Sequence, residues 1–251
     1  MQDHNALKES YQRDGFLHIP QFINAQEHDE IEIHVNHIIQ QVVPQMPKQD
    51  AMYEDYDRPE SLKQVNVPLA DTPLPLVELQ QSEKVQGLAT ALLGDQAVPQ
   101  SIELFIKPPK LGTPTPPHQD GFYFCLEPDL ALTLWLALDD MDDENGTLHY
   151  IAGSHTHGIL SHSASQVLGF SQGVQADDLT PFGREVTCYL RRGDLLIHNS
   201  STIHRASGNP SNRLRRALAM VYYGKSTQRD PEKYRRYQEL VQNQQESMGV
   251  R

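Results

Sequence analysis

The sequence predicts a mainly β fold, a sandwich or jelly roll with flanking helices. Two observations predict this class. From Ser101 onward, the apolar residues change from helical spacing to strict alternation. Short alternating segments then recur as far as Tyr223, separated by turn-forming stretches such as Arg191-Arg192-Gly193-Asp194. Short strands joined by such turns are typical of packed antiparallel sheets.

The residues before Ser101 are predicted to be mainly helical. Asn24, with Glu27 three residues later, forms a candidate capping box, and apolar residues follow at helical spacing as far as Val42. Pro44 should end this helix. The remaining expectations here are loop or short strand over 44–71 and a second helix from about Leu76 to Leu93, ending at Gly94.

The first predicted strand carries Ile102 and Leu104 on one face and Glu103 and Phe105 on the other, because successive side chains of a strand alternate. The further strand candidates are Leu130 to Leu138, Thr147 to Ile151, Val186 to Leu190, Asp194 to His198, Thr202 to Ala206 and Arg215 to Tyr223.

Residues 152–183 have little apolar periodicity, which indicates either a lid or binding loop, or a mobile surface insertion. Asp230 to Gln242 is expected to be a charged surface helix. We expect one domain over residues 1–251, with a helical part at about 1–95, a core at about 101–224 and the last helix at about 230–242.

Composition excludes several classes of partner. The net charge of −12 and the pI near 5.4 argue against binding to nucleic acid or anionic membranes. No apolar run approaches the roughly 20 residues of a membrane helix, and the two cysteines offer neither a disulfide framework nor a Cys-rich zinc site. We therefore expect a cytoplasmic protein, monomeric or weakly homo-oligomeric, that acts on a small molecule.

The strongest functional signal is His118-Gln119-Asp120. On an extended segment the His and Asp side chains point to the same side, so both can hold one metal ion. Such pairs also arise by chance among 12 histidines and 33 acidic residues. His28-Asp29-Glu30 is the control, because it lies in a helical stretch and is expected to be solvated surface. His118 differs because a proline-rich, extended arm precedes it.

His204 can supply a second imidazole and complete two histidines and one carboxylate, the ligand set of non-heme Fe(II) oxygenases. His198 is a competing ligand. Such a set leaves room for a bidentate 2-oxo acid and for dioxygen. The far carboxylate of that acid needs a cation, and a planar Arg suits it best. Arg215 is the candidate, with Arg213 and Arg216 as competitors, although Arg216 should face away from the pocket.

The sequence resembles the phytanoyl-CoA dioxygenase family of Fe(II)/2-oxoglutarate oxygenases from roughly Phe16 to Tyr223. The elements that carry the resemblance are His118-Gln119-Asp120, Leu134-Trp135-Leu136-Ala137-Leu138-Asp139-Asp140, Glu144-Asn145-Gly146-Thr147-Leu148, Gly153-Ser154-His155, Arg192-Gly193-Asp194, and His204 with Asn209 and Arg215.

The resemblance implies a double-stranded β-helix, a cupin-like jelly roll. It also implies that Lys63 and Trp135 assist Arg215 in binding 2-oxoglutarate, although Trp135 alone could be core packing. Ala206 stands where the family often has a hydroxyl, and Ser207 or Thr202 could replace it. Family halogenases lack the metal carboxylate, so Asp120 favours hydroxylation.

We therefore expect an Fe(II)- and 2-oxoglutarate-dependent dioxygenase that uses O2 to hydroxylate an unactivated carbon of a small organic molecule, with release of succinate and CO2. The alternatives are a jelly-roll protein that binds a small carboxylate without turnover, and a zinc hydrolase using the same three ligands. Lys107 is expected to be a solvated strand end. The candidate substrate-binding residues are Glu103, Phe105, Phe122 and Tyr123, together with residues 152–183.

Overall fold

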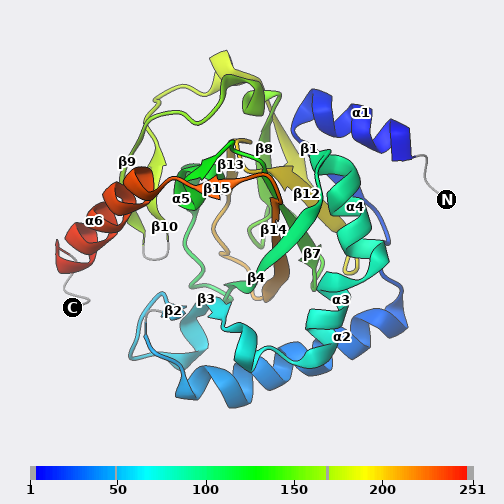
Figure 1. Cartoon of the computed structure of the whole chain (residues 1–251). Helices are drawn as coiled ribbons and strands as arrows, with labels where there is room; N and C mark the ends of the chain where they lie inside the picture. The colour runs from blue at the N-terminus through cyan, green and yellow to red at the C-terminus, as the bar shows by residue number, and fades with distance from the viewer. Residues whose placement is uncertain (1–3, 49, 168–169, 248–251) are drawn as a thin grey trace.

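A computed structural model describes residues 4–48, 50–167 and 170–247. Its main sheet is antiparallel and seven-stranded, in the order β1-β12-β7-β14-β4-β3-β2. A second sheet has the order β11-β8-β13-β5, and the pairs β9–β10 and β6–β15 complete the strands. The two larger sheets face each other, since the hydroxyl of Tyr150 on β8 reaches His198 on β12. Figure 1 shows α2, α3 and α4 curving around one side of this arrangement, with α6 lying near β10 on the other side.

The strands bear out the predicted mainly β class, and most lie where the alternation placed them. Their bounds are β1 Phe16–Ile19, β2 Ala51–Tyr53, β3 Leu62–Val67, β4 Ala97–Lys107, β5 Thr115–His118, β6 Leu126–Glu127, β7 Ala131–Ala137, β8 Leu148–Ala152, β9 His162–Val167, β10 Phe170–Val174, β11 Arg184–Cys188, β12 Leu195–Asn199, β13 His204–Ala206, β14 Arg215–Gly224 and β15 Gln228–Arg229.

The helices are α1 His4–Asp14, α2 Ala25–His37, α3 Leu74–Gln81, α4 Glu83–Leu93, α5 Asp120–Phe124 and α6 Pro231–Ser247. The capping box of α2 is present, because Asn24 Oδ1 accepts from Glu27 N and Glu27 Oε2 accepts from Asn24 N. The helix then continues to Gln45 through one π turn and one 3-10 turn.

Three expectations about local structure were wrong. The single helix from Leu76 to Leu93 is two helices, because Ser82 is extended and caps α4 through its hydroxyl. Residues 152–183 are not irregular throughout, since they contain the hairpin β9–β10. His28 is not solvated: it is 1% exposed, and its Nε2 lies 2.8 Å from the carbonyl oxygen of Leu138.

Two hydrophobic layers position the site. The outer face of the main sheet and the helices share one buried apolar cluster, which includes Leu134, Val35 and Leu88. The inner face packs against the second sheet through a smaller layer that includes Trp135 and Tyr150. Because side chains alternate along β7, its inner positions, such as Thr133 and Trp135, point to the space between the sheets. No helix in the described part of the chain is long and apolar enough to cross a membrane.

Candidate metal centre

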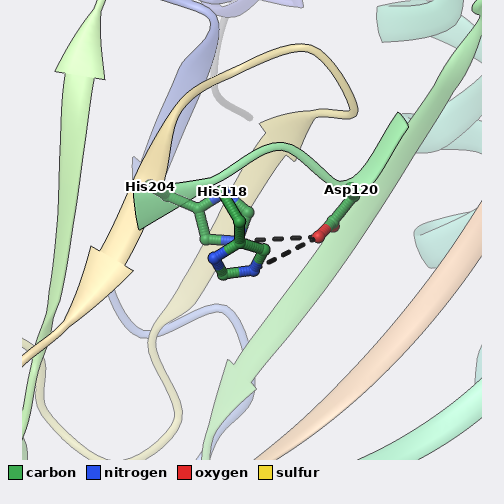
Figure 2. Close-up of side chains that lie close together, drawn as sticks. All are labelled: His118, Asp120 and His204. Carbon is green, nitrogen blue, oxygen red and sulfur yellow. Dashed lines mark ion pairs between the residues drawn. The ribbon is translucent and has the colours of Figure 1, made fainter. Parts of the chain in front are cut away.

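Three side chains from the end of β5, the start of α5 and β13 meet between the sheets. His118 and His204 are directly opposite each other in the β5–β13 pairing. One ligand atom from each of His118, Asp120 and His204 lies within 4.8 Å of the others. The Nε2 atoms of His118 and His204 are 3.7 and 3.6 Å from Asp120 Oδ1. Figure 2 marks these two ion pairs with dashed lines. Because Gln119 is extended, the side chains of His118 and Asp120 lie on the same side as the His204 ring.

The ring orientation of each histidine leaves Nε2 available as a ligand. His118 Nδ1 lies 2.9 Å from the carbonyl oxygen of Pro116, and His204 Nδ1 lies 3.0 Å from that of Thr202. A carbonyl only accepts, so each Nδ1 carries the proton and donates it. Burial lowers the pKa of both imidazoles, that of His204 especially. Both rings are therefore neutral at pH 7, with a lone pair on Nε2.

The carboxylate of Asp120 is oriented by two further residues. Its Oδ2 accepts hydrogen bonds from Thr133 Oγ1 at 2.9 Å and from His198 Nε2 at 3.0 Å. His198 Nδ1 in turn pairs with the hydroxyl of Tyr150 at 2.9 Å. Burial acts to raise the pKa of Asp120, but the surrounding imidazoles outweigh it and hold the pKa below its ordinary value. His198, the competing ligand, thus holds the carboxylate while Oδ1 faces the other two histidines.

These residues fit a divalent metal ion. Two neutral imidazoles and one ionised carboxylate oxygen converge from one side, which is the donor set of a facial Fe(II) centre. Sequence inspection missed Thr133 as a support of this set. Thr133 could have been found in the sequence, because it is the one polar residue in the otherwise apolar strand β7.

Arg215, the first residue of β14, enters the same cavity as a buried cation. It is 3% exposed, and its guanidinium carbon lies 5.3 Å from the centre of the Trp135 ring. Its Nε has no hydrogen-bond partner, and no ion pair joins it to a carboxylate among the residues that the structure describes. Burial lowers the pKa of Arg215 to about 9, so the group stays charged at pH 7. A buried cation without a counterion favours an anionic ligand.

Lys107 lies opposite Arg215 in the β4–β14 pairing and is 5% exposed, so the expectation of a solvated strand end was wrong. Its ammonium donates to the carbonyl of Thr113, and to Thr115 Oγ1 at 3.4 Å. Gly146 makes room for it, because a Cβ there would lie 2.5 Å from Lys107 Cδ. Burial, and then the charge of Arg215, lower the pKa of Lys107.

Lys63 lines the same end of the cavity but has a counterion. Its Nζ lies 3.2 Å from Glu54 Oε2, and Glu54 also accepts from Thr113. The competing arginines are occupied elsewhere. Arg216 pairs with Asp139 and Glu32, Arg213 pairs with Asp142, and neither lines the cavity.

Neither hydroxyl suggested as a replacement at position 206 lines the cavity. Ala206 lines the cavity, whereas Thr202 donates to the carbonyl of Gly15 and the hydroxyl of Ser207 pairs with His149. Thr115 lies opposite Ala206 in the pairing and lines the cavity. The proximity of Thr115 to Ala206 had no signal in the sequence, because it depends on the β5–β13 register.

The cavity that joins these groups measures about 280 Å³. Of the candidate substrate residues, Glu103, Phe105 and Tyr123 line it. Phe122 instead stacks on His162 at a centroid distance of 4.2 Å and is not part of the lining. The hairpin within 152–183 packs behind Tyr123, whose hydroxyl donates to the carbonyl of Gln172 at 2.5 Å.

Comparisons with known sequences agree with this geometry. The family model described as phytanoyl-CoA dioxygenase (PhyH) matches residues 11–217. Phytanoyl-CoA dioxygenase domain-containing protein 1 of Bos taurus is 35% identical over 141 residues, which are 54% of this chain and 48% of that protein. A probable alpha-ketoglutarate-dependent hypophosphite dioxygenase of Stutzerimonas stutzeri is 28% identical over 148 residues, or 57% and 51% of the two chains. The chain spans about half the length of the curated relatives it matches.

Solved structures share the fold. The epimerase SnoN, in complex with Fe3+, alpha ketoglutarate and nogalamycin RO, superposes with a TM-score of 0.72 at 24% identity, covering 91% of this chain and 86% of SnoN. EctD from S. alaskensis, with 2-oxoglutarate and 5-hydroxyectoine, gives a TM-score of 0.72 at 18% identity, covering 88% and 76%. These similarities confirm the predicted jelly roll.

Proposed function

Because the chain belongs to the phytanoyl-CoA dioxygenase family, we propose that it is an Fe(II)- and 2-oxoglutarate-dependent dioxygenase that hydroxylates an unactivated carbon of a small organic molecule. The observation that carries the proposal is the pairing of a two-histidine, one-carboxylate set with the buried, unpaired Arg215 in one cavity. A 2-oxo dicarboxylic acid matches both features, because one end chelates a metal and the other is an anion.

The chemistry that iron and 2-oxoglutarate supply when bound is oxidative decarboxylation coupled to substrate oxidation, so that O2 provides one oxygen atom to succinate and one to the hydroxylated product. His118, Asp120 and His204 would hold the iron through Nε2, Oδ1 and Nε2. Thr133 and His198 restrain Asp120 so that Oδ2 is engaged and Oδ1 stays directed at the site.

The far carboxylate of 2-oxoglutarate would pair with Arg215, whose planar guanidinium can donate two parallel hydrogen bonds. The guanidinium of Arg215 lies over the Trp135 ring, which supports it through a cation–π contact. Lys107 adds positive charge at the same end, and Lys63 does so less strongly because Glu54 already pairs with it. The buried setting keeps water away from these charges, which strengthens their attraction for the anion.

Two alternatives use the same residues less completely. A zinc hydrolase would need the three ligands and a water molecule, and it would leave Arg215 without a role. A binding protein for a small carboxylate would use Arg215 but would not need an open metal face. Consumption of 2-oxoglutarate separates the proposed enzyme from both.

Anaerobic titration of the metal-free protein with Fe(II) and 2-oxoglutarate tests the proposal. We expect the visible charge-transfer band of a chelated keto acid in the wild type. His204→Ala should abolish the band, and Arg215→Ala should shift it to much higher 2-oxoglutarate concentration. Arg213→Ala, which removes an exposed arginine paired with Asp142, is the matched control and should leave the titration unchanged. Metal binding without a band in the wild type would refute the proposal.

A further inference from the structure

The cavity has opposite polarity at its two ends along β4. Lys107, Phe105 and Glu103 are successive inward residues of this strand, and all three line the cavity. Lys107 faces Arg215 across the sheet, whereas Glu103 faces the small Ala219. One end therefore carries the guanidinium of Arg215 and the amino group of Lys107, and the other carries the carboxyl group of Glu103 beside a small side chain. The proposed function uses the cationic end and leaves Glu103 unexplained.

Glu103 has hydrogen bonds but no counterion. Ser101 donates to its Oε1 at 2.9 Å, and the side chain of Gln64 also donates to it. No ion pair joins it to a lysine or arginine within the described ranges, and the charged group that acts on it is Asp120, a second carboxylate. Burial and this repulsion raise the pKa of Glu103 to about 7. A partly buried carboxylate in this position lacks a positive partner.

Gln64 provides a second group that could accept a hydrogen bond from a ligand. It lines the cavity and is 7% exposed. The amide nitrogen Nε2 of Gln64 donates to Asn66 Oδ1 at 3.2 Å, and the same side chain donates a hydrogen bond to Glu103. Its Oε1 is therefore the free end of the amide, and this atom is buried without a partner. A buried acceptor left unpaired costs free energy, which a ligand with N–H donors would recover.

Aromatic rings also line the cavity. Tyr123 and Tyr237 pack edge to face at 5.7 Å, and both line the cavity together with Phe124. Ring faces attract cations, most strongly where water is excluded. The combination of one carboxylate, one free amide oxygen and aromatic walls matches an ammonium group, which carries positive charge and several N–H donors.

We propose that the primary substrate is a small molecule carrying an ammonium group, held in the cavity by Glu103 and Gln64. The inference rests on the proposed function, because it takes the cationic end to be filled by 2-oxoglutarate. It assigns the two ends of the cavity to ligands of opposite charge. An anionic substrate would instead face the carboxyl group of Glu103, which has no positive partner among the described residues.

The test compares three probes of equal chain length: n-butylammonium, n-butanol and butyrate. The protein is loaded with Zn(II), a diamagnetic substitute for iron, and with 2-oxoglutarate, and each probe is titrated by protein-observed NMR. We expect n-butylammonium to bind at least about tenfold more tightly than either other probe, since hydrogen bonds to a charged group contribute about that factor. Glu103→Gln should remove this preference.

Glu78→Gln is the matched control, because it removes one negative charge from an exposed position on α3 and should leave the preference intact. Gln64→Leu has a side chain of similar size, removes both the free oxygen and the N–H that donates to Glu103, and should weaken n-butylammonium binding. Equal binding of the three probes to wild type, preference for butyrate, or a preference retained in Glu103→Gln would each overturn the inference.

The optical titration of the Fe(II) protein separates this outcome from failure of the proposed function. A normal charge-transfer band with no preference for n-butylammonium refutes only the substrate class. Absence of the band refutes the oxygenase itself, and the inference falls with it. The Glu103→Gln protein should form the band at the wild-type 2-oxoglutarate concentration, which shows that the variant is folded and that its metal end is intact.

Discussion

His198 Nε2 lies 3.0 Å from Asp120 Oδ2, the carboxylate oxygen that does not face His118 and His204. Thr133 donates to the same oxygen, so both lone-pair directions of Oδ2 are engaged. The carboxylate is thereby held with Oδ1 toward the site before any ion arrives. Such support of a metal ligand typically changes metal affinity by about 10- to 100-fold.

The first prediction removes one of these two bonds. Thr133→Val replaces the hydroxyl with a methyl group of similar size and should weaken Fe(II) binding about tenfold. Competition with a chelator of known affinity measures the change. Thr187→Val is the control, because Thr187 carries a similar hydroxyl that pairs with His149, a residue outside the ligand set. Equal metal affinity in both variants would show that Thr133 does not orient Asp120.

The extent of the cavity's positive end could not be predicted from the sequence. His118, Asp120, His204 and Arg215 stand in recognisable local patterns, and the strand alternation places Arg215 on the inner face of β14. Lys107 follows the same alternation, yet it was expected at a solvated end. Its burial depends on glycine at positions 112 and 146, because a Cβ atom at either position would clash with the Lys107 side chain. It also depends on the pairing of β4 with β14. Such contacts between distant segments leave no local pattern.

Local breaks were missed for a similar reason. The apolar spacing from Leu76 to Leu93 is compatible with one helix, and only the extended Ser82 divides it. The hairpin β9–β10 lies beside β5 and α6, yet it lacks the apolar alternation from which the other strands were predicted. In contrast, the capping box at Asn24 is contained in four consecutive residues, and it was predicted correctly.

The second prediction tests Lys107 as part of the co-substrate end. Lys107→Met keeps the length of the side chain and removes its charge, so about tenfold more 2-oxoglutarate should be needed to form the Fe(II) charge-transfer band. The thermal midpoint should not fall, because the variant also removes a buried charge that repels Arg215. The exposed Lys110→Met serves as the control. If Lys107→Met titrates like wild type, Arg215 alone accounts for the anion affinity.

The third prediction concerns stability away from the site. Asn24→Ala removes the side chain that accepts hydrogen bonds from Gln26 N and Glu27 N at the start of α2. Loss of such a cap costs about 1 kcal/mol. Chemical denaturation should therefore show a lower free energy of unfolding, while Fe(II) and 2-oxoglutarate titrations stay as in wild type. A change in either titration would mean that α2 is coupled to the metal centre.

The fourth prediction uses the raised pKa of Glu103. Its ordinary value of 4.5 applies to the unfolded chain, and the folded value is about 7. Below pH 4.5 the Glu103 carboxyl is protonated in both the folded and the unfolded state, so it does not change the free energy of unfolding. As the pH rises from 4.5 to 7, the unfolded chain ionises first, so the folded state loses stability, and above pH 7 the loss is constant. Its size is up to about 3 kcal/mol, because each unit of pKa corresponds to about 1.4 kcal/mol.

Glu103→Gln cannot ionise and should escape this loss. Its free energy of unfolding, measured by denaturant titration without metal or 2-oxoglutarate, should match wild type near pH 4.5 and exceed it increasingly up to pH 7. Comparing the difference between the two proteins cancels the contributions of all other titrating groups. An amide can also keep the bond from Ser101 and donate to the free Oε1 of Gln64. Parallel pH curves would show that Glu103 ionises normally in the folded protein, and would contradict the raised pKa.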